Sequence, residues 1–353
     1  MRVSVKTAMF ATMLVVPLVL SGCGFDKGSS GSVKPGPDKK VDYVKGDKSK
    51  KADEQDKKAS EADAKKGERS ATLYLLDANG RISPQVVQLP QTKSVAKQSL
   101  KYLIKDGPVS DILPNGFQAV IPSGTTIHGV NLDNGTLVAN FSKDFLDYKA
   151  DQEKDILEAI TWTLTQFDNI KRVQIQIDGK NKKVMPVGKT PIGKGLSRSD
   201  GINTELGNVV DVAASDNITV YYLSEHDDIS YYVPVTTRVN SNKNNVAQAV
   251  NALLNGPSGK GLSSPFGTGV ALKDDPVVKD GVVTLNFNKA LLTNEKDKTI
   301  SSEAINCLAL TLTGQNNIKK VAIEVDGSTK VMKETGEPLT EPVSRPTVNK
   351  TGV

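Results

Sequence analysis

Few residues of this sequence could carry out catalysis, and their spacing decides which chemistry is possible. Gly188-Lys189-Thr190 resembles the end of a phosphate-binding loop, in which a glycine-rich turn cradles phosphate groups before a helix. That loop requires a glycine five residues before Gly188, where this chain has Lys183. The segment also follows an expected strand hairpin instead of lying between a strand and a helix. We therefore predict no nucleotide site here.

The residue types that bind metals come together locally at Glu225-His226-Asp227-Asp228. This cluster directly follows an expected strand, so a solvated hairpin tip explains it more simply than a metal site does. The chain has only two histidines and two cysteines, and Cys23 and Cys307 lie far apart in the sequence. A zinc site or a Cys/His nucleophilic pair would need more of these residues in one region. We predict no metal and no cofactor.

Two aspartates occupy corresponding places in two similar segments, Asp178 before Gly179 and Asp326 before Gly327. General acid–base catalysis would favour two carboxyl groups close together in one segment. Here each segment has one, and Asp-Gly is favoured in turns for backbone reasons. We therefore predict turns at these positions, no catalytic residues and no enzymatic activity.

The N-terminal residues have the features of a bacterial lipoprotein signal. Ala8–Leu20 is an uncharged apolar run of 13 residues. It is too short to span a bilayer, which needs ~20 residues, but suits a secretory signal. Leu20-Ser21-Gly22-Cys23 then looks like a lipobox, so we predict residues 1–22 as the signal peptide and Cys23 as the acylated N-terminus. Two or more palmitate-type chains anchor a protein stably. We therefore predict an extracytoplasmic location with attachment to the membrane. The alternative is an ordinary signal peptide followed by a chance cysteine.

Charge and composition exclude some partners. Removal of the signal, which carries Arg2 and Lys6, lowers the formal net charge from +5 to +3. This weak balance argues against nucleic acid, which requires a concentrated basic face. Once Cys23 carries lipid, Cys307 has no partner in the chain, and we predict it as a small buried hydrophobic residue.

A charged tether follows the predicted anchor. Residues 34–69 hold 12 Lys+Arg and 9 Asp+Glu and show no hydrophobic period. Such a segment buries too little apolar surface to offset its chain entropy. We predict residues 23–70 as the lipidated cysteine and a disordered tether.

The remainder reads as a tandem repeat. "TLYLL" (72–76) matches "TVYYL" (219–223), "NGTLVANF" (134–141) matches "DGVVTLNF" (280–287), and "NIKRVQIQIDG" (169–179) matches "NIKKVAIEVDG" (317–327). Apolar residues at helical spacing lie between these strand-like segments in both copies. We predict an α+β fold: two tandem repeats at 71–190 and 218–335, each a mixed β-sheet with two helices packed on one face. Residues 191–217 form the predicted linker and 336–353 the tail.

Three residues are candidates for contacts with a partner. Asn140 and Asn286 occupy the same strand position in both copies, on the face opposite the apolar residues. They could contact a partner or bond a neighbouring edge or loop, and we favour the second explanation. Trp162, the single tryptophan, lies in a predicted helix, where packing is the simpler explanation and an exposed position would mark an interface.

The lipobox, the tether and the duplicated unit together resemble the GerM family of sporulation and germination lipoproteins from endospore-forming bacteria. The repeat resembles the GerMN domain at Leu100–Pro108, "IPSGT" (121–125), "NGTLVANFSKDF" (134–145) and "NIKRVQIQIDG"; the second copy departs at "SPFGTGVAL" (264–272). The resemblance implies a similarity to ring-building motifs, the α+β units that pack side by side in secretion-system rings.

The resemblance further implies a non-enzymatic role. Such lipoproteins help assemble or localise the trans-envelope sporulation complex, in the space between mother cell and forespore. The implied location is the outer forespore membrane, and the implied partners are proteins of the sporulation channel, with oligomerisation possible.

Two other functions remain open on the sequence. A cell-wall or glycan-binding lipoprotein that docks a partner enzyme would need exposed aromatic residues, for which the candidates are Tyr221, Tyr222, Tyr231 and Tyr232. An extracytoplasmic hydrolase would need a nucleophile or an acid pair, which the sequence does not show.

Overall fold

The computed structural model describes residues 67–207, 209, 212–241 and 245–349 of the 353-residue chain. The predicted signal peptide, Cys23 and the tether up to residue 66 lie outside the described residues. Within the described part, no helix is both long and apolar enough to cross a membrane.

The first repeat begins with a two-stranded antiparallel hairpin, β1 (Glu68–Leu76) and β2 (Ile82–Pro90). Strand β1 starts inside the stretch predicted as tether. The sequence did not indicate β2, which forms its own two-stranded sheet with β1 apart from the larger sheet. Helix α2 follows at Val95–Lys101. The sequence predicts a helix that continues to Gly107-Pro108, because glycine favours a helix end and proline prevents continuation. This prediction is wrong for the first repeat, because α2 ends at Lys101 with Tyr102 as its C-cap.

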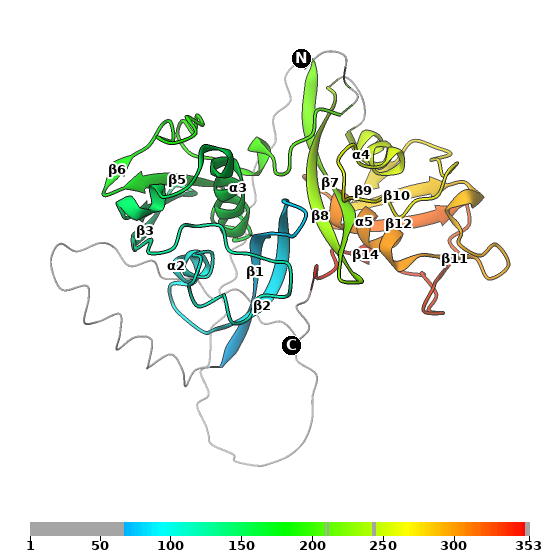
Figure 1. Cartoon of the computed structure of the whole chain (residues 1–353). Helices are drawn as coiled ribbons and strands as arrows, with labels where there is room; N and C mark the ends of the chain where they lie inside the picture. The colour runs from blue at the N-terminus through cyan, green and yellow to red at the C-terminus, as the bar shows by residue number, and fades with distance from the viewer. Residues whose placement is uncertain (1–66, 208, 210–211, 242–244, 350–353) are drawn as a thin grey trace, which may run out of the picture. The chain divides into compact units, whose positions relative to one another are not determined.

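The larger sheet of the first repeat has four strands in the order β3-β4-β5-β6. These are β3 (Ile127–Asp133), β4 (Thr136–Phe141), β5 (Arg172–Ile177) and β6 (Lys180–Asn181). The β3–β4 turn has Asn134 and Gly135 at φ 46° and 76°, the left-handed conformations that a two-residue Asn-Gly hairpin requires. Strands β4 and β5 are parallel, and the chain connects them through helix α3 (Glu153–Leu164) (Figure 1).

The second repeat has the same order of elements. Its hairpin is longer, with β7 (Ser215–His226) and β8 (Ile229–Asn240), followed by α4 (Asn245–Asn255). Its sheet has the order β14-β12-β10-β9, with helix α5 (Ser302–Leu312) between the parallel strands β10 and β12. The sheet strands are β9 (Val277–Lys279), β10 (Val282–Phe287), β12 (Lys320–Val325) and β14 (Val343–Ser344), and the short pair β11 (Thr299–Ile300) and β13 (Met332–Lys333) lies apart.

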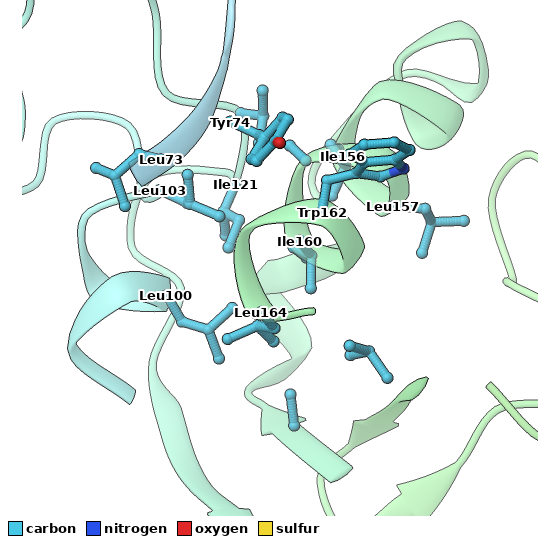
Figure 2. Packing of buried hydrophobic residues seen from close by; sticks show 14 of the residues in the cluster. Leu73, Tyr74, Leu100, Leu103, Ile121, Ile156, Leu157, Ile160, Trp162 and Leu164 are labelled. Carbon is cyan, nitrogen blue, oxygen red and sulfur yellow. The ribbon is translucent and has the colours of Figure 1, made fainter. Parts of the chain in front are cut away.

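Each repeat has its own hydrophobic core, built from the positions that the periodicity predicts. In the first repeat, Leu164 of α3 lies beside Leu100 of α2 (Figure 2). Both side chains are 0% exposed, as are Leu103 and Ile160. Phe141 stacks on Phe145 with ring centroids 4.4 Å apart. Core residues of the second repeat include Phe287, Leu308, Leu312 and the free Cys307, which is buried as predicted. The α+β tandem repeat is therefore confirmed.

Candidate functional site at the junction of the repeats

The Gly188-Lys189-Thr190 segment binds a carboxylate of its own chain. Glu153, the first residue of α3, is 1% exposed. The backbone N–H of Gly188 donates to its Oε2 at 2.7 Å, that of Thr190 to Oε1 at 2.9 Å, and the hydroxyl of Tyr148 to Oε2 at 2.8 Å. Burial alone would raise the pKa of Glu153, but these hydrogen bonds outweigh it and lower the pKa. The anion held by this loop is thus internal.

Gly188 is required for that carboxylate to approach the loop. A Cβ at this position would lie 2.7 Å from Oε1 of Glu153 and 2.9 Å from the carbonyl oxygen of Ala150. The negative charge also lies at the N-terminus of α3, where the helix dipole favours it. The segment therefore fixes the start of a core helix.

The predicted turns at the two aspartates explain the repeated asparagines. Asp178 and Asp326 have φ of 46° and 49°, and a glycine with positive φ follows each. Asn140 Oδ1 accepts a hydrogen bond from the N–H of Gly179 at 2.9 Å. Asn286 Oδ1 accepts one from the N–H of Gly327, also at 2.9 Å. Both side chains thus close the adjacent turn in the same way, the second of the two explanations considered above.

Trp162 is 3% exposed and packs with its ring centroid 5.5 Å from that of Tyr74. Its indole N–H donates to the carbonyl of Gly201, in the predicted linker, at 3.0 Å. The ring is buried against its own chain, so Trp162 packs in the core, the simpler of its two explanations, and it is not an exposed contact for a partner. The glycan-binding alternative loses its support similarly: Tyr221, Tyr222 and Tyr231 are each 3% exposed, and Tyr232 is half-buried.

The acidic and histidine cluster at the tip of the β7–β8 hairpin contacts the first repeat. The ring of His226 lies so close to Gly116 that a side chain there would overlap it. The amide of Asn115 donates to Asp227. Among the residues that the structure describes, no group of three His, Cys, Asp or Glu could hold a metal ion. The cluster belongs to the contact between the repeats.

The centre of this junction is formed by two equivalent tyrosines. Tyr74 of β1 and Tyr221 of β7 lie at the same place in their repeats, each paired with a proline, Pro84 or Pro234. Burial raises the pKa of Tyr74, the neighbouring Tyr221 raises it further, and two arginines lower it. The guanidinium of Arg198 lies 6.0 Å from the centroid of the Tyr74 ring, and that of Arg345 donates to the hydroxyl of Tyr221 at 2.8 Å.

The arginines near these tyrosines are also equivalent. Arg198 donates to the carbonyl of Trp162 and to the hydroxyl of Thr165, at the C-terminal end of α3. Arg345 donates to the carbonyl of Leu310 at 2.7 Å and to the hydroxyl of Thr313 at 3.2 Å, at the corresponding end of α5. Cations are favourable at helix C-termini, where carbonyl groups lack helical partners. Both guanidinium groups line a groove of about 650 Å³ but already bond the helix ends.

Two asparagines connect the hairpins. Asn203 Oδ1 accepts from the N–H of Ile82 at 2.9 Å, and its Nδ2 donates to the carbonyls of Ile82 and Pro234, both at 2.7 Å. The amide of Asn349 makes the mirrored set. Its Oδ1 accepts from the N–H of Tyr232 at 2.8 Å, and its Nδ2 donates to the carbonyls of Pro84 at 2.7 Å and Tyr232 at 2.8 Å.

We call residues 196–203 and 343–349, which carry these arginines and asparagines, the two straps. The straps lie in the predicted linker and the predicted tail, so the repeat pattern did not indicate them. Their signal was a short similarity outside the main repeat, "SRSDGIN" (197–203) against "SRPTVN" (344–349).

Further contacts of the junction are not symmetric. Asp77 is 4% exposed and accepts from the hydroxyl of Tyr231 at 3.0 Å. The ring of Tyr231 also meets Phe117 edge-on, with centroids 5.0 Å apart. Arg81 forms an ion pair with Glu205 at 3.4 Å, and both side chains are largely buried. These contacts join the first repeat to the second and to the linker in one orientation.

Comparison with known proteins identifies similar chains. A model of the Germane family, described as sporulation and spore germination, matches residues 72–183 and 219–331. The chain is 44% identical over 354 residues to the spore germination protein GerM of Bacillus subtilis (strain 168), with 97% of each covered. It is also similar to the solved tandem GerMN domains of the sporulation protein GerM from Bacillus subtilis, at 47% identity and a TM-score of 0.75, covering 80% of this chain and 99% of that one. In each repeat, the segment that the Germane model matches ends before the strap begins.

Proposed function

Because the chain belongs to the Germane family of sporulation and spore germination proteins, we propose that it is a non-enzymatic lipoprotein that helps assemble or localise the trans-envelope sporulation complex. It acts from the outer forespore membrane, facing the space between mother cell and forespore, and its partners are proteins of that complex.

The observation that carries this proposal is the contrast between the internal polar groups and the sheet edges. The side chains with potential for chemistry, such as Glu153, Asp77 and Arg198, are bonded within the chain. Strands β3 and β9 are outermost in their sheets, and on β9 Val277 and Val278 are 63% and 47% exposed. Outer strands present N–H and C=O groups that can pair with a strand from another protein.

Membrane attachment rests on Cys23, and the second cysteine supplies a matched control. We expect Cys23→Ala to remove the protein from the membrane fraction of sporulating cells and to reduce sporulation. Cys307→Ala, at a buried position, should leave attachment unchanged. Retention of the Cys23→Ala protein in the membrane fraction would contradict the anchor.

The assembly role is tested by imaging a C-terminal fluorescent fusion, joined after residue 353 through a flexible linker, during sporulation. We expect accumulation at the engulfing septum and then around the forespore. An even signal over vegetative membranes that sporulation does not change would contradict the assembly role and favour wall binding.

A further inference from the structure

The contacts at the centre of the junction occur in symmetric pairs. Asn203 bonds the backbone of Ile82 and reaches Pro234 of the other hairpin. Asn349 bonds the backbone of Tyr232, the equivalent of Ile82, and reaches Pro84, the equivalent of Pro234. An interface in which each side repeats the contacts of the other is isologous, the arrangement of two-fold symmetric dimers. The chain therefore carries a dimer-type interface between its own halves.

The straps make this interface possible. Strands β2 and β8 face each other but do not pair, and each carries a proline with no N–H to donate. The asparagine amides supply the donors for the proline carbonyls. The first strap continues along β8, where the N–H of Glu205 donates to the carbonyl of Thr236 at 2.9 Å. In the second strap, the carbonyl of Asn349 accepts from the N–H of Val86 on β2 at 3.0 Å.

Within the residues that the structure describes, the two sides are joined covalently only through the peptide chain of the linker. Gly207, inside this linker, lies close to Arg238 of β8, and β7 begins at Ser215. The junction contacts themselves are all hydrogen bonds, ion pairs and side-chain packing. A repeat with the same sequence from another molecule would offer the same groups.

We propose that the junction is a two-fold pairing surface, and that the matching repeat of a second copy of this chain can occupy it in place of the chain's own. The C-terminal strap is part of this surface. Exchange of an identical element between copies is a low-cost route to dimers, because the contacts formed are the same as those lost.

The test uses the full chain with a protease recognition sequence inserted between Val212 and Ala213. The protein is folded first and cleaved afterwards. We expect the two fragments to stay together at about 10 μM. Size-exclusion chromatography with light scattering should then give the mass of the uncut chain. Separation of the folded fragments at this concentration would overturn the proposal.

Exchange between copies is measured by mixing two cleaved preparations, one tagged on the first repeat and the other untagged but uniformly labelled with ¹⁵N, and by unfolding and refolding the mixture. Capture of the tag, followed by mass spectrometry, should retrieve ¹⁵N-labelled and unlabelled second repeats in proportion to their amounts in the mixture. Recovery of no second repeat from the untagged preparation would overturn the proposal.

Matched variants connect the pairing to the straps. Asn203→Ala and Asn349→Ala should each weaken the association of the fragments by roughly tenfold to hundredfold, because each leaves several backbone groups unsatisfied. Asn140→Ala, which removes a turn bond inside one repeat, should leave the association unchanged. Circular dichroism of the variants verifies that the fragments remain folded. Equal affinities for the strap variants and the control would refute the role of the straps.

Discussion

Replacement of Glu153 by glutamine tests whether the loop at 188–190 acts as an internal anion site. The carboxylate is 1% exposed and accepts three hydrogen bonds of 2.7–2.9 Å. A hydrogen bond to a charged group contributes roughly 1.5–3 kcal/mol. Glutamine keeps one acceptor oxygen but turns an amide N–H toward a backbone N–H. We therefore expect Glu153→Gln to lower the free energy of unfolding by about 2–4 kcal/mol at pH 7.

The pH dependence gives a sharper result than the loss at one pH. The folded state lowers the pKa of Glu153, so its contribution is fully present above the unfolded pKa of 4.5 and is lost as the pH falls through the folded pKa. The difference between wild type and Glu153→Gln should therefore be largest near neutral pH and shrink in acid. Urea unfolding at pH 7, 5 and 3.5, followed by circular dichroism, measures this difference.

A control separates the loop from general charge effects. Glu295 is exposed, and Glu295→Gln should change the free energy of unfolding by less than about 0.5 kcal/mol at every pH. If Glu153→Gln behaved like this control, or if its loss in free energy of unfolding grew in acid, the loop would not hold the carboxylate as the geometry requires.

Two further predictions concern the junction. Burial raises the pKa of Asp77, the opposite of the shift at Glu153. The stability of the wild type relative to Asp77→Asn should therefore fall as the pH rises above 3.8, which the same urea series measures. A rise in this relative stability would contradict the raised pKa of Asp77. Gly207 has φ +64°, and a Cβ there would lie 2.5 Å from Oγ1 of Thr237, so Gly207→Ala should lower the free energy of unfolding by about 2 kcal/mol or more. Gly80 has φ +75° but open space around it, so Gly80→Ala should lower it by only about 1 kcal/mol through backbone strain. Thermal unfolding of the pair checks this difference, and equal losses would show that the linker at Gly207 does not pack closely on β8.

The parts of the fold that sequence reasoning predicted are those whose pattern depends on one buried face. Strands β4 and β10 alternate strictly between buried and half-buried positions and end in Phe141 and Phe287, both 0% exposed. Helices α3 and α5 place their periodic residues in the two cores. The Asn-Gly and Asp-Gly turns need left-handed backbone, which few other residue pairs provide.

Strand β2 escaped prediction because both of its faces are covered. Its first four residues, Ile82 to Gln85, are all buried, so they show no alternation between polar and apolar types. Pro84 lies within these four, and a proline inside a strand argues against that assignment when only the sequence is read. In the structure, Pro84 nevertheless lies within β2 opposite Tyr74 of β1, and its carbonyl accepts a hydrogen bond from the amide of Asn349.

The straps show why neither repeat can be understood from its own residues alone. The carbonyl of Pro84, in the first repeat, bonds Asn349, which follows the second repeat. The carbonyl of Pro234, in the second repeat, bonds Asn203, which follows the first repeat. Buried carbonyls without partners would cost each hairpin stability, so each strap stabilises the hairpins that it bonds. The family match ends at residue 331 in the second repeat, whereas β14 and the strap extend that repeat to residue 349. A truncation placed at the family boundary would therefore remove Arg345 from the end of α5 and Asn349 from the junction. A segment that retains all of these contacts therefore contains both repeats and both straps.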